Sequence, residues 1–156
     1  MWPFPNADSA FRDAVRREFA PLATECGASL QEIDTLIFGF CTSNAVLSIG
    51  AYPGHFRSVC VKLRRREEGE RLSVKDGADF GLAVIEEFVI GRRSEIYSKR
   101  QRWESLEIKE EVAALASKTR EVAMAFLMTA GGDWAGLRLF VDEKISKASD
   151  AKPWLK

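Results

Sequence analysis

The hydrophobic period changes twice along this chain of 156 residues, and no other feature restricts its fold as much. Up to about Gly27, apolar side chains recur every three or four residues, which indicates a helix with one buried face. From about Leu30 to Val74 they alternate with polar side chains, which indicates strands. After Gly77 the helical period returns. The order of a helix, then strands, then helices is typical of an α+β domain.

A first helix is predicted between Asp8 and Gly27. Asp8 or Ser9 can accept a hydrogen bond from a backbone amide at its start, and Gly27 can end it. Pro21 is expected to bend or interrupt it, because proline lacks an N–H group and crowds the carbonyl four residues earlier. The positions that form its buried face are Phe11, Val15, Phe19 and Leu22.

Three or four antiparallel strands are predicted next, because short turns separate the alternating segments. Turn residues stand at Thr42-Ser43-Asn44 and Pro53-Gly54-His55, and the charged residues 64–70 are typical of a long solvated hairpin end. The strands are expected at residues 30–40, 45–51 and 58–63, with a short fourth at 71–74.

Three further helices follow. Asp79 is expected to cap one that Gly91 ends, and the longest runs from about Leu106 to Thr129. Gly131-Gly132 breaks that helix, and Asp133 caps a last one, which carries Trp134, Leu137, Val141 and Ile145. The stripe predicted to be buried in the longest helix is Ile108, Val112, Leu115, Thr119, Val122 and Phe126.

The predicted fold is therefore α+β: an N-terminal helix, a three- to four-stranded antiparallel meander, and C-terminal helices packed on one sheet face. The other face is expected to be solvated or available to a partner. The length suits a single domain over residues 1–156, with an ordered core of about 8–147 and a frayed tail, 148–156.

Charge and hydropathy narrow the class of protein. Lys+Arg and Asp+Glu both number 23, so the net charge is zero, which argues against a generally basic nucleic-acid binder and against an acidic DNA mimic. No apolar run approaches the roughly 18 residues that span a bilayer. Residues 1–5 lack the basic and apolar regions of a signal peptide. We expect a cytoplasmic protein without membrane contact.

No residue pattern predicts catalysis, a metal or a cofactor. His55 is the only histidine, and Cys26, Cys41 and Cys60 lack CxxC spacing, so a closed zinc site is not expected. The cysteines are typical of small buried apolar residues. Gly131-Gly132 lacks the spacing of a phosphate-binding loop. We therefore predict a protein that is not an enzyme.

Paired carboxylates occur at Glu67-Glu68, Glu86-Glu87 and Glu110-Glu111. Neighbours in a helix point about 100° apart, so neither of the last two pairs shares a face. They are expected to lie on solvated sides of their helices, and they do not indicate an acid–base pair.

Two basic runs, residues 62–71 and 92–102, are the candidate binding segments. The second is interleaved with aromatic residues, and such a pattern can bind phosphate and stack bases. Trp, Tyr and Arg are also the types enriched at the centres of protein interfaces. Glutamates dilute both runs, which favours an ordinary solvated surface or a protein contact over nucleic-acid binding. The predicted partner-binding residues are Tyr97, Arg100, Arg102 and Trp103, the alternative being that the Trp103 ring packs onto the protein's own core.

The order of elements resembles that of small bacterial proteins of unknown function and of immunity proteins in polymorphic-toxin systems. The segments that carry the resemblance are FRDAVRREFAPLATECG, IFGFCTSNAVLSIGAY, SVCVKLRRR, GLAVIEEFV, VAALASKTREVAMAFL and GGDWAGLRLF. The resemblance implies a non-enzymatic protein that neutralises a partner toxin, with no catalytic residue. A similar order occurs in type III secretion chaperones, which leaves a dimeric chaperone or scaffold, partnered with a secreted effector, as an alternative. Nucleic-acid binding through residues 62–71 and 92–102 is another.

Overall fold

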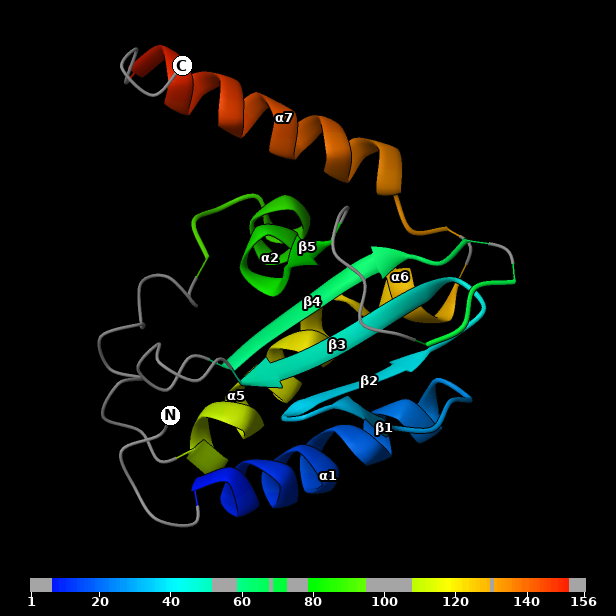
Figure 1. Ribbon diagram of the computed structural model, residues 1–156. Helices are drawn as coiled ribbons and strands as arrows, with labels where there is room; N and C mark the ends of the chain where they lie inside the picture. Colours follow the sequence, from blue (N-terminus) through cyan, green and yellow to red (C-terminus); the bar gives the residue numbers. More distant parts are fainter. Residues whose placement is uncertain are drawn as a thin grey trace.

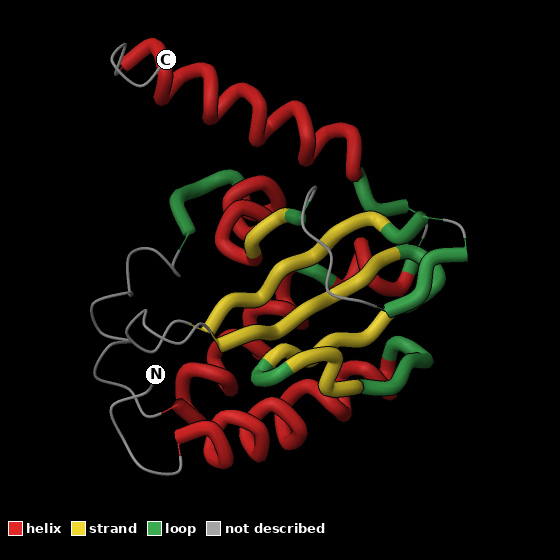
Figure 2. The backbone as a smooth tube through the Cα atoms, in the orientation of Figure 1, coloured by secondary structure: helices red, strands yellow, loops and turns green. Residues whose placement is uncertain are grey.

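The protein is an α+β fold in which a helix, an antiparallel sheet and further helices follow one another (Figures 1 and 2). A computed structural model describes residues 7–51, 59–67, 69–72, 79–94, 108–129 and 131–151. Five strands form its sheet, in the order β1-β2-β3-β4-β5, and every neighbouring pair is antiparallel. The sheet is the predicted meander, with strands at the boundaries given below.

Helix α1 spans Ala7–Glu25, and its predicted apolar face is buried without exception. Pro21 does not interrupt it, contrary to the prediction. The proline lies on the exposed side, where water can hydrate the carbonyl group that loses its intrahelical partner. Gly27 ends the helical segment as predicted, with a φ of 73°.

The first predicted strand is two strands joined by a tight turn. β1 spans Gln31–Asp34 and β2 spans Ile37–Cys41, so the prediction of one strand over residues 30–40 was wrong. Leu36 makes the turn with a φ of 57°, a conformation that disfavours leucine, and its side chain is nevertheless buried. Its amide donates to Glu32 Oε2 at 3.3 Å, and its carbonyl accepts from Ala51 N at 3.0 Å.

The next hairpin follows the prediction closely. β3 spans Ala45–Ala51 and β4 spans Val59–Arg65. Thr42 Oγ1 accepts hydrogen bonds from the amides of Asn44 and Ala45, both at 3.1 Å, and so closes the predicted turn between β2 and β3. The apolar side chains that face the core from these strands are Ala45, Leu47, Ile49, Ala51, Val59, Val61 and Leu63.

The last strand and the helix after it begin elsewhere than predicted. β5 is the short strand Phe80–Gly81, and α2 spans Leu82–Ile90. Residues 71–72 are not in a strand, and residues 73–74 lie outside the described part. Asp79 does not cap α2, because Gly81 takes the capping position and no side chain caps there. Gly91 ends α2 as predicted, with a φ of 81°.

The longest predicted helix is divided in the structure. α5 spans Ile108–Val122, a turn at Ala123 follows, and α6 spans Met124–Met128. Apart from half-buried Ile108, the predicted stripe is buried. Asp133 caps α7 as predicted, since its Oδ1 accepts from Gly136 N at 2.8 Å. α7 spans Trp134–Ala151, past the predicted core boundary at residue 147.

Helices α1, α5 and α6 lie on one face of the sheet, and the main core fills the space between (Figure 1). α2 lies beside the β4–β5 edge, and α7 packs on α2 with its C-terminal half pointing away from the body. The expectation that the second sheet face is open was wrong for the central strands, since no residue of β2 or β3 is exposed. On that face, a Cβ added to Gly39 would meet Ile33 and Leu72, so these side chains cover it.

Candidate functional site

The residues predicted to bind a partner lie outside the described part of the chain. Tyr97, Arg100, Arg102 and Trp103 all fall within 95–107, and His55 falls within 52–58. Their roles remain predictions. The described residues on either side, Ser94 and Ile108, connect this segment to α2 and α5.

The described part of the basic run 62–71 is largely engaged within the protein. Arg64 is buried and forms ion pairs with Glu70 and, at 3.5 Å, with Asp79. Arg66 donates to the carbonyls of Glu70 at 3.0 Å and Thr42 at 2.9 Å. The charge of Arg64 is thus compensated locally, and Arg66 joins the residues after β4 to the turn between β2 and β3.

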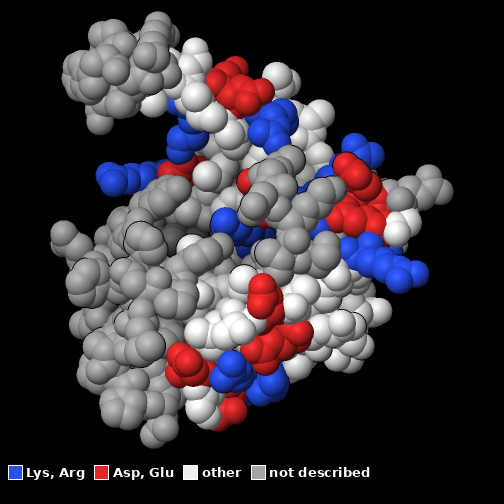
Figure 3. All heavy atoms as spheres, viewed as in Figure 1, with Lys and Arg blue, Asp and Glu red and all other residues white. Residues whose placement is uncertain are grey.

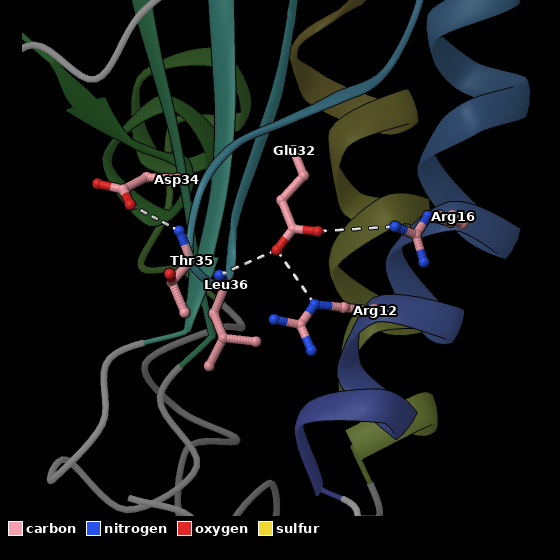
Figure 4. A network of polar contacts seen from close by, with 6 residues as sticks. All are labelled: Arg12, Arg16, Glu32, Asp34, Thr35 and Leu36. Carbon is pink, nitrogen blue, oxygen red and sulfur yellow. Dashed lines mark hydrogen bonds and ion pairs between the residues drawn. The ribbon is translucent and has the colours of Figure 1, made fainter.

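Charge on the visible face is mixed rather than segregated. Figure 3 shows basic and acidic side chains next to one another among the described residues. Figure 4 shows one such group, in which Glu32 of β1 accepts from Arg12 Nε at 3.1 Å and lies 3.6 Å from Arg16 Nη2. The same carboxylate accepts a hydrogen bond from the backbone amide of Leu36. This group ties the edge strand β1 to α1.

The glutamates predicted to be solvated include three that are buried. Glu86, Glu87 and Glu111 are 2%, 8% and 4% exposed. The helical period places Glu86 and Glu87 on different faces of α2. Both faces are nevertheless covered, because α2 packs against several elements. The prediction of solvated helix sides was wrong for these residues.

Glu86 is the centre of a buried polar cluster. Its Oε1 accepts from Ser94 Oγ, and its Oε2 lies 2.7 Å from Lys118 Nζ. Lys118 also donates to Glu121 Oε2 at 2.8 Å. Burial disfavours the charged ammonium group, but the hydrogen bonds to Glu121 and Glu86 outweigh it and raise the pKa of Lys118. The lysine is therefore held as a cation.

The other two buried glutamates join separate segments. Glu87 Oε1 accepts from Ser94 N at 3.2 Å, and its Oε2 pairs with Lys144 of α7. Glu111 Oε1 accepts from Val59 N at 3.3 Å and so connects α5 to the start of β4. Because Ser94 is fully buried against these carboxylates, its hydroxyl is not presented to a substrate. The cluster has the features of a structural network.

The described residues hold no group of three or more histidine, cysteine, aspartate or glutamate side chains placed to bind a metal ion. Cys26, Cys41 and Cys60 are half-buried and are not joined in disulfides. Burial, together with the neighbouring Glu25 carboxylate, raises the pKa of the Cys26 thiol, against the opposing effect of Arg120. The Cys26 thiolate is therefore disfavoured.

Exposed large apolar side chains of the described residues occur on three of the helices. Among the described residues these are Val89 (48% exposed), Met128 (51%), Leu139 (65%) and Ile145 (60%). They belong to α2, to the end of α6 and to α7, whereas α1, α5 and the sheet contribute none. Single exposed apolar residues are ordinary, but their restriction to one part of a fold marks a candidate interface.

The contacts beneath α7 are mostly aromatic. Trp134 lies 4.9 Å from the Phe126 ring and 6.1 Å from Phe80, between ring centroids. Arg138 lies over the Phe80 ring, 4.6 Å from its centroid. Further along, Phe140 lies 5.6 Å from Phe88 and Lys144 pairs with Glu87. The helix is therefore attached along one stripe, beyond which Ile145 remains exposed.

Sequence reasoning identified the apolar stripe of α7 but not this surface. Trp134, Leu137, Val141 and Ile145 recur at helical spacing, yet in the structure only Leu137 is buried and Ile145 is exposed. The period of apolar residues indicates which side of a helix is apolar. It does not indicate how much of α7 is covered, because that depends on how far α2 extends beneath it. Exposed Leu139, on the opposite side, is the one signal in the sequence, since it interrupts the polar face.

In the described part of the chain, no helix combines the length and hydropathy needed to cross a membrane. Comparison with protein families, curated proteins and solved structures finds no match to this chain.

Proposed function

We propose that this chain is a protein-binding domain and that the α2–α7 surface, defined by Val89, Met128, Leu139 and Ile145, contacts the partner. The observation that carries the proposal is that three of the four exposed large apolar side chains of the described residues lie on α2 and α7, the fourth, Met128, being the last residue of α6. Burying such side chains on binding removes apolar area from water, which stabilises a complex by roughly 25 cal/mol per Å² before the costs of association.

The proposed activity is that of an immunity protein, which neutralises a toxin by covering a site on it. The order of elements supports this class, together with a structure whose buried ionisable groups serve to join its segments. In this class, function requires a stable surface of fixed shape rather than a reactive group. The partner is then encoded beside this chain, since a toxin and its immunity protein are inherited together.

The test is binding to, and protection from, the products of neighbouring genes. Purified wild-type protein and the double variant Leu139→Ser/Ile145→Ser are compared by calorimetry against each product. We expect the double variant to bind at least about tenfold more weakly, because two apolar anchors are lost. The matched control is Lys147→Ser, which changes an exposed residue of the same helix and should bind like wild type.

Two results would contradict the proposal. If no neighbouring product binds the wild-type chain or is neutralised by it in cells, the immunity role is wrong. If a product binds the double variant as tightly as wild type, the α2–α7 surface is not the interface. Binding to DNA or RNA that weakens steeply with salt would instead favour the nucleic-acid alternative.

A further inference from the structure

Ser94 is held by two carboxylates of α2 that depend on different parts of the fold. Its hydroxyl donates to Glu86 Oε1, and its backbone amide donates to Glu87 Oε1 at 3.2 Å. Ser94 is fully buried, and it is the last described residue before residues 95–107. The point from which that segment continues is therefore fixed by the two carboxylates together.

The cation that balances Glu86 belongs to the body of the fold. Lys118 of α5 lies 2.7 Å from Glu86 Oε2, and its side chain is only 12% exposed. The same lysine donates to Glu121 Oε2 at 2.8 Å, and its helix packs against α1 and α2. The bond from the Ser94 hydroxyl to Glu86 is therefore independent of α7.

The cation that balances Glu87 comes from α7 instead. Glu87 Oε2 pairs with Lys144, whose side chain is 46% exposed, and no other cation of the described residues pairs with this carboxylate. Residues 142–148 of α7 are all exposed, and among them Lys144 is the one with an ion pair to α2. The pair therefore forms only while this half of α7 lies against α2.

Loss of that pair has a consequence for Ser94. Glu87 is 8% exposed, so without Lys144 its charge would be left buried with no cation beside it. A buried carboxylate in that state is costly, and turning the side chain toward water relieves the cost. The Ser94 amide then loses its acceptor. The position of Lys144 thus decides whether the backbone of Ser94 is held.

We infer that α7 and Ser94 are coupled through Glu87, so that displacement of the C-terminal half of α7 releases the backbone of Ser94 from α2. Contacts that a partner makes with Lys144 or the neighbouring Ile145 then alter the start of the segment 95–107. The coupling is a property of the chain alone, and it holds whether or not the immunity role is correct.

Hydrogen exchange of the Ser94 amide in the full-length protein tests the coupling. In Lys144→Met we expect this amide to exchange at least about tenfold faster than in wild type, because its acceptor is lost. Lys144→Arg keeps the ion pair and should restore the wild-type rate. The matched control is Lys147→Met, which replaces an exposed lysine of the same helix and should leave the rate unchanged.

Glu87→Gln separates the coupling from simple loosening of α7. Glutamine is uncharged and needs no cation, yet its amide oxygen can still accept from Ser94 N. This variant loses the ion pair to α7, but its Ser94 amide should stay within about threefold of the wild-type exchange rate. Two results would overturn the inference. One is a Ser94 amide that exchanges in Lys144→Met as in wild type, and the other is one that exchanges in Glu87→Gln as fast as in Lys144→Met.

Discussion

At the scale of single residues, the buried glutamates show why side-chain roles were hard to predict. Glu86, Glu87 and Glu111 stand in helical segments beside other charged residues, a context that usually indicates a solvated face. Their partners come from elsewhere: Lys118 for Glu86, and the amide of Val59 for Glu111. A buried carboxylate is stable only when such partners meet it, and which residues meet is decided by the packing of α2, α5 and β4.

Lys118 provides a prediction at this scale. Its pKa is raised above its ordinary value in the folded protein, so its ion pairs contribute stability that is fully present below about pH 10.4 and is lost at higher pH. The difference in unfolding free energy between wild type and Lys118→Met should therefore shrink as the pH rises above that value. Urea denaturation at a series of pH values measures it.

The matched control for Lys118 is Lys147→Met, which replaces an exposed lysine of α7. Its unfolding free energy should differ from that of wild type by a small amount that does not depend on pH. A Lys118→Met difference that stays constant across the alkaline range would show that the ammonium group is not held by Glu86 and Glu121.

At the scale of elements, the segments with a strong period were predicted well. The face of α1 and the stripe of α5 and α6 follow from spacing alone, because each is a long amphipathic segment against one core. The turn between β2 and β3 was also predicted from the sequence, because Thr42 carries a side chain that closes it. The break at Ala123 had no such signal, because no glycine or proline marks it.

The β1–β2 turn was missed for a physical reason that can be tested. No glycine or asparagine marks it, and Leu36 takes the left-handed conformation there because its side chain is buried. Leu36→Ala and Leu36→Gly both lose that burial, but only glycine also relieves the backbone strain. The glycine variant should be more stable than the alanine variant by about 1 kcal/mol, in chemical denaturation.

The same pair of substitutions at Leu47, in the middle of β3, is the control. There the usual order should hold, with alanine more stable than glycine, since extended backbone offers glycine no advantage. If alanine is also the more stable replacement at position 36, the left-handed turn is absent in solution.

At the scale of the whole molecule, the fold is divided into a closed body and an attached end. The body comprises the sheet with α1, α2, α5 and α6, and several of its described charges pair within it. The attached end is α7, which carries two of the four exposed large apolar side chains of the described residues. Binding was predicted from the aromatic and basic residues of one segment. The exposure of the apolar side chains of α7 depends instead on how much of that helix the body covers. Spacing cannot show that.

The predicted binding segment 92–102 begins next to α2, because Ser94 donates hydrogen bonds to Glu86 and Glu87 of that helix. A joint interface of this segment with α2 and α7 is therefore our prediction. Trp103→Ala tests this: we expect partner binding to weaken by at least ~2 kcal/mol with the melting temperature nearly unchanged, as for an aromatic interface anchor. Calorimetric titration and thermal melts measure both quantities. A large fall in melting temperature would instead assign the indole ring to the protein's own core, and α2 and α7 alone would then have to supply the interface.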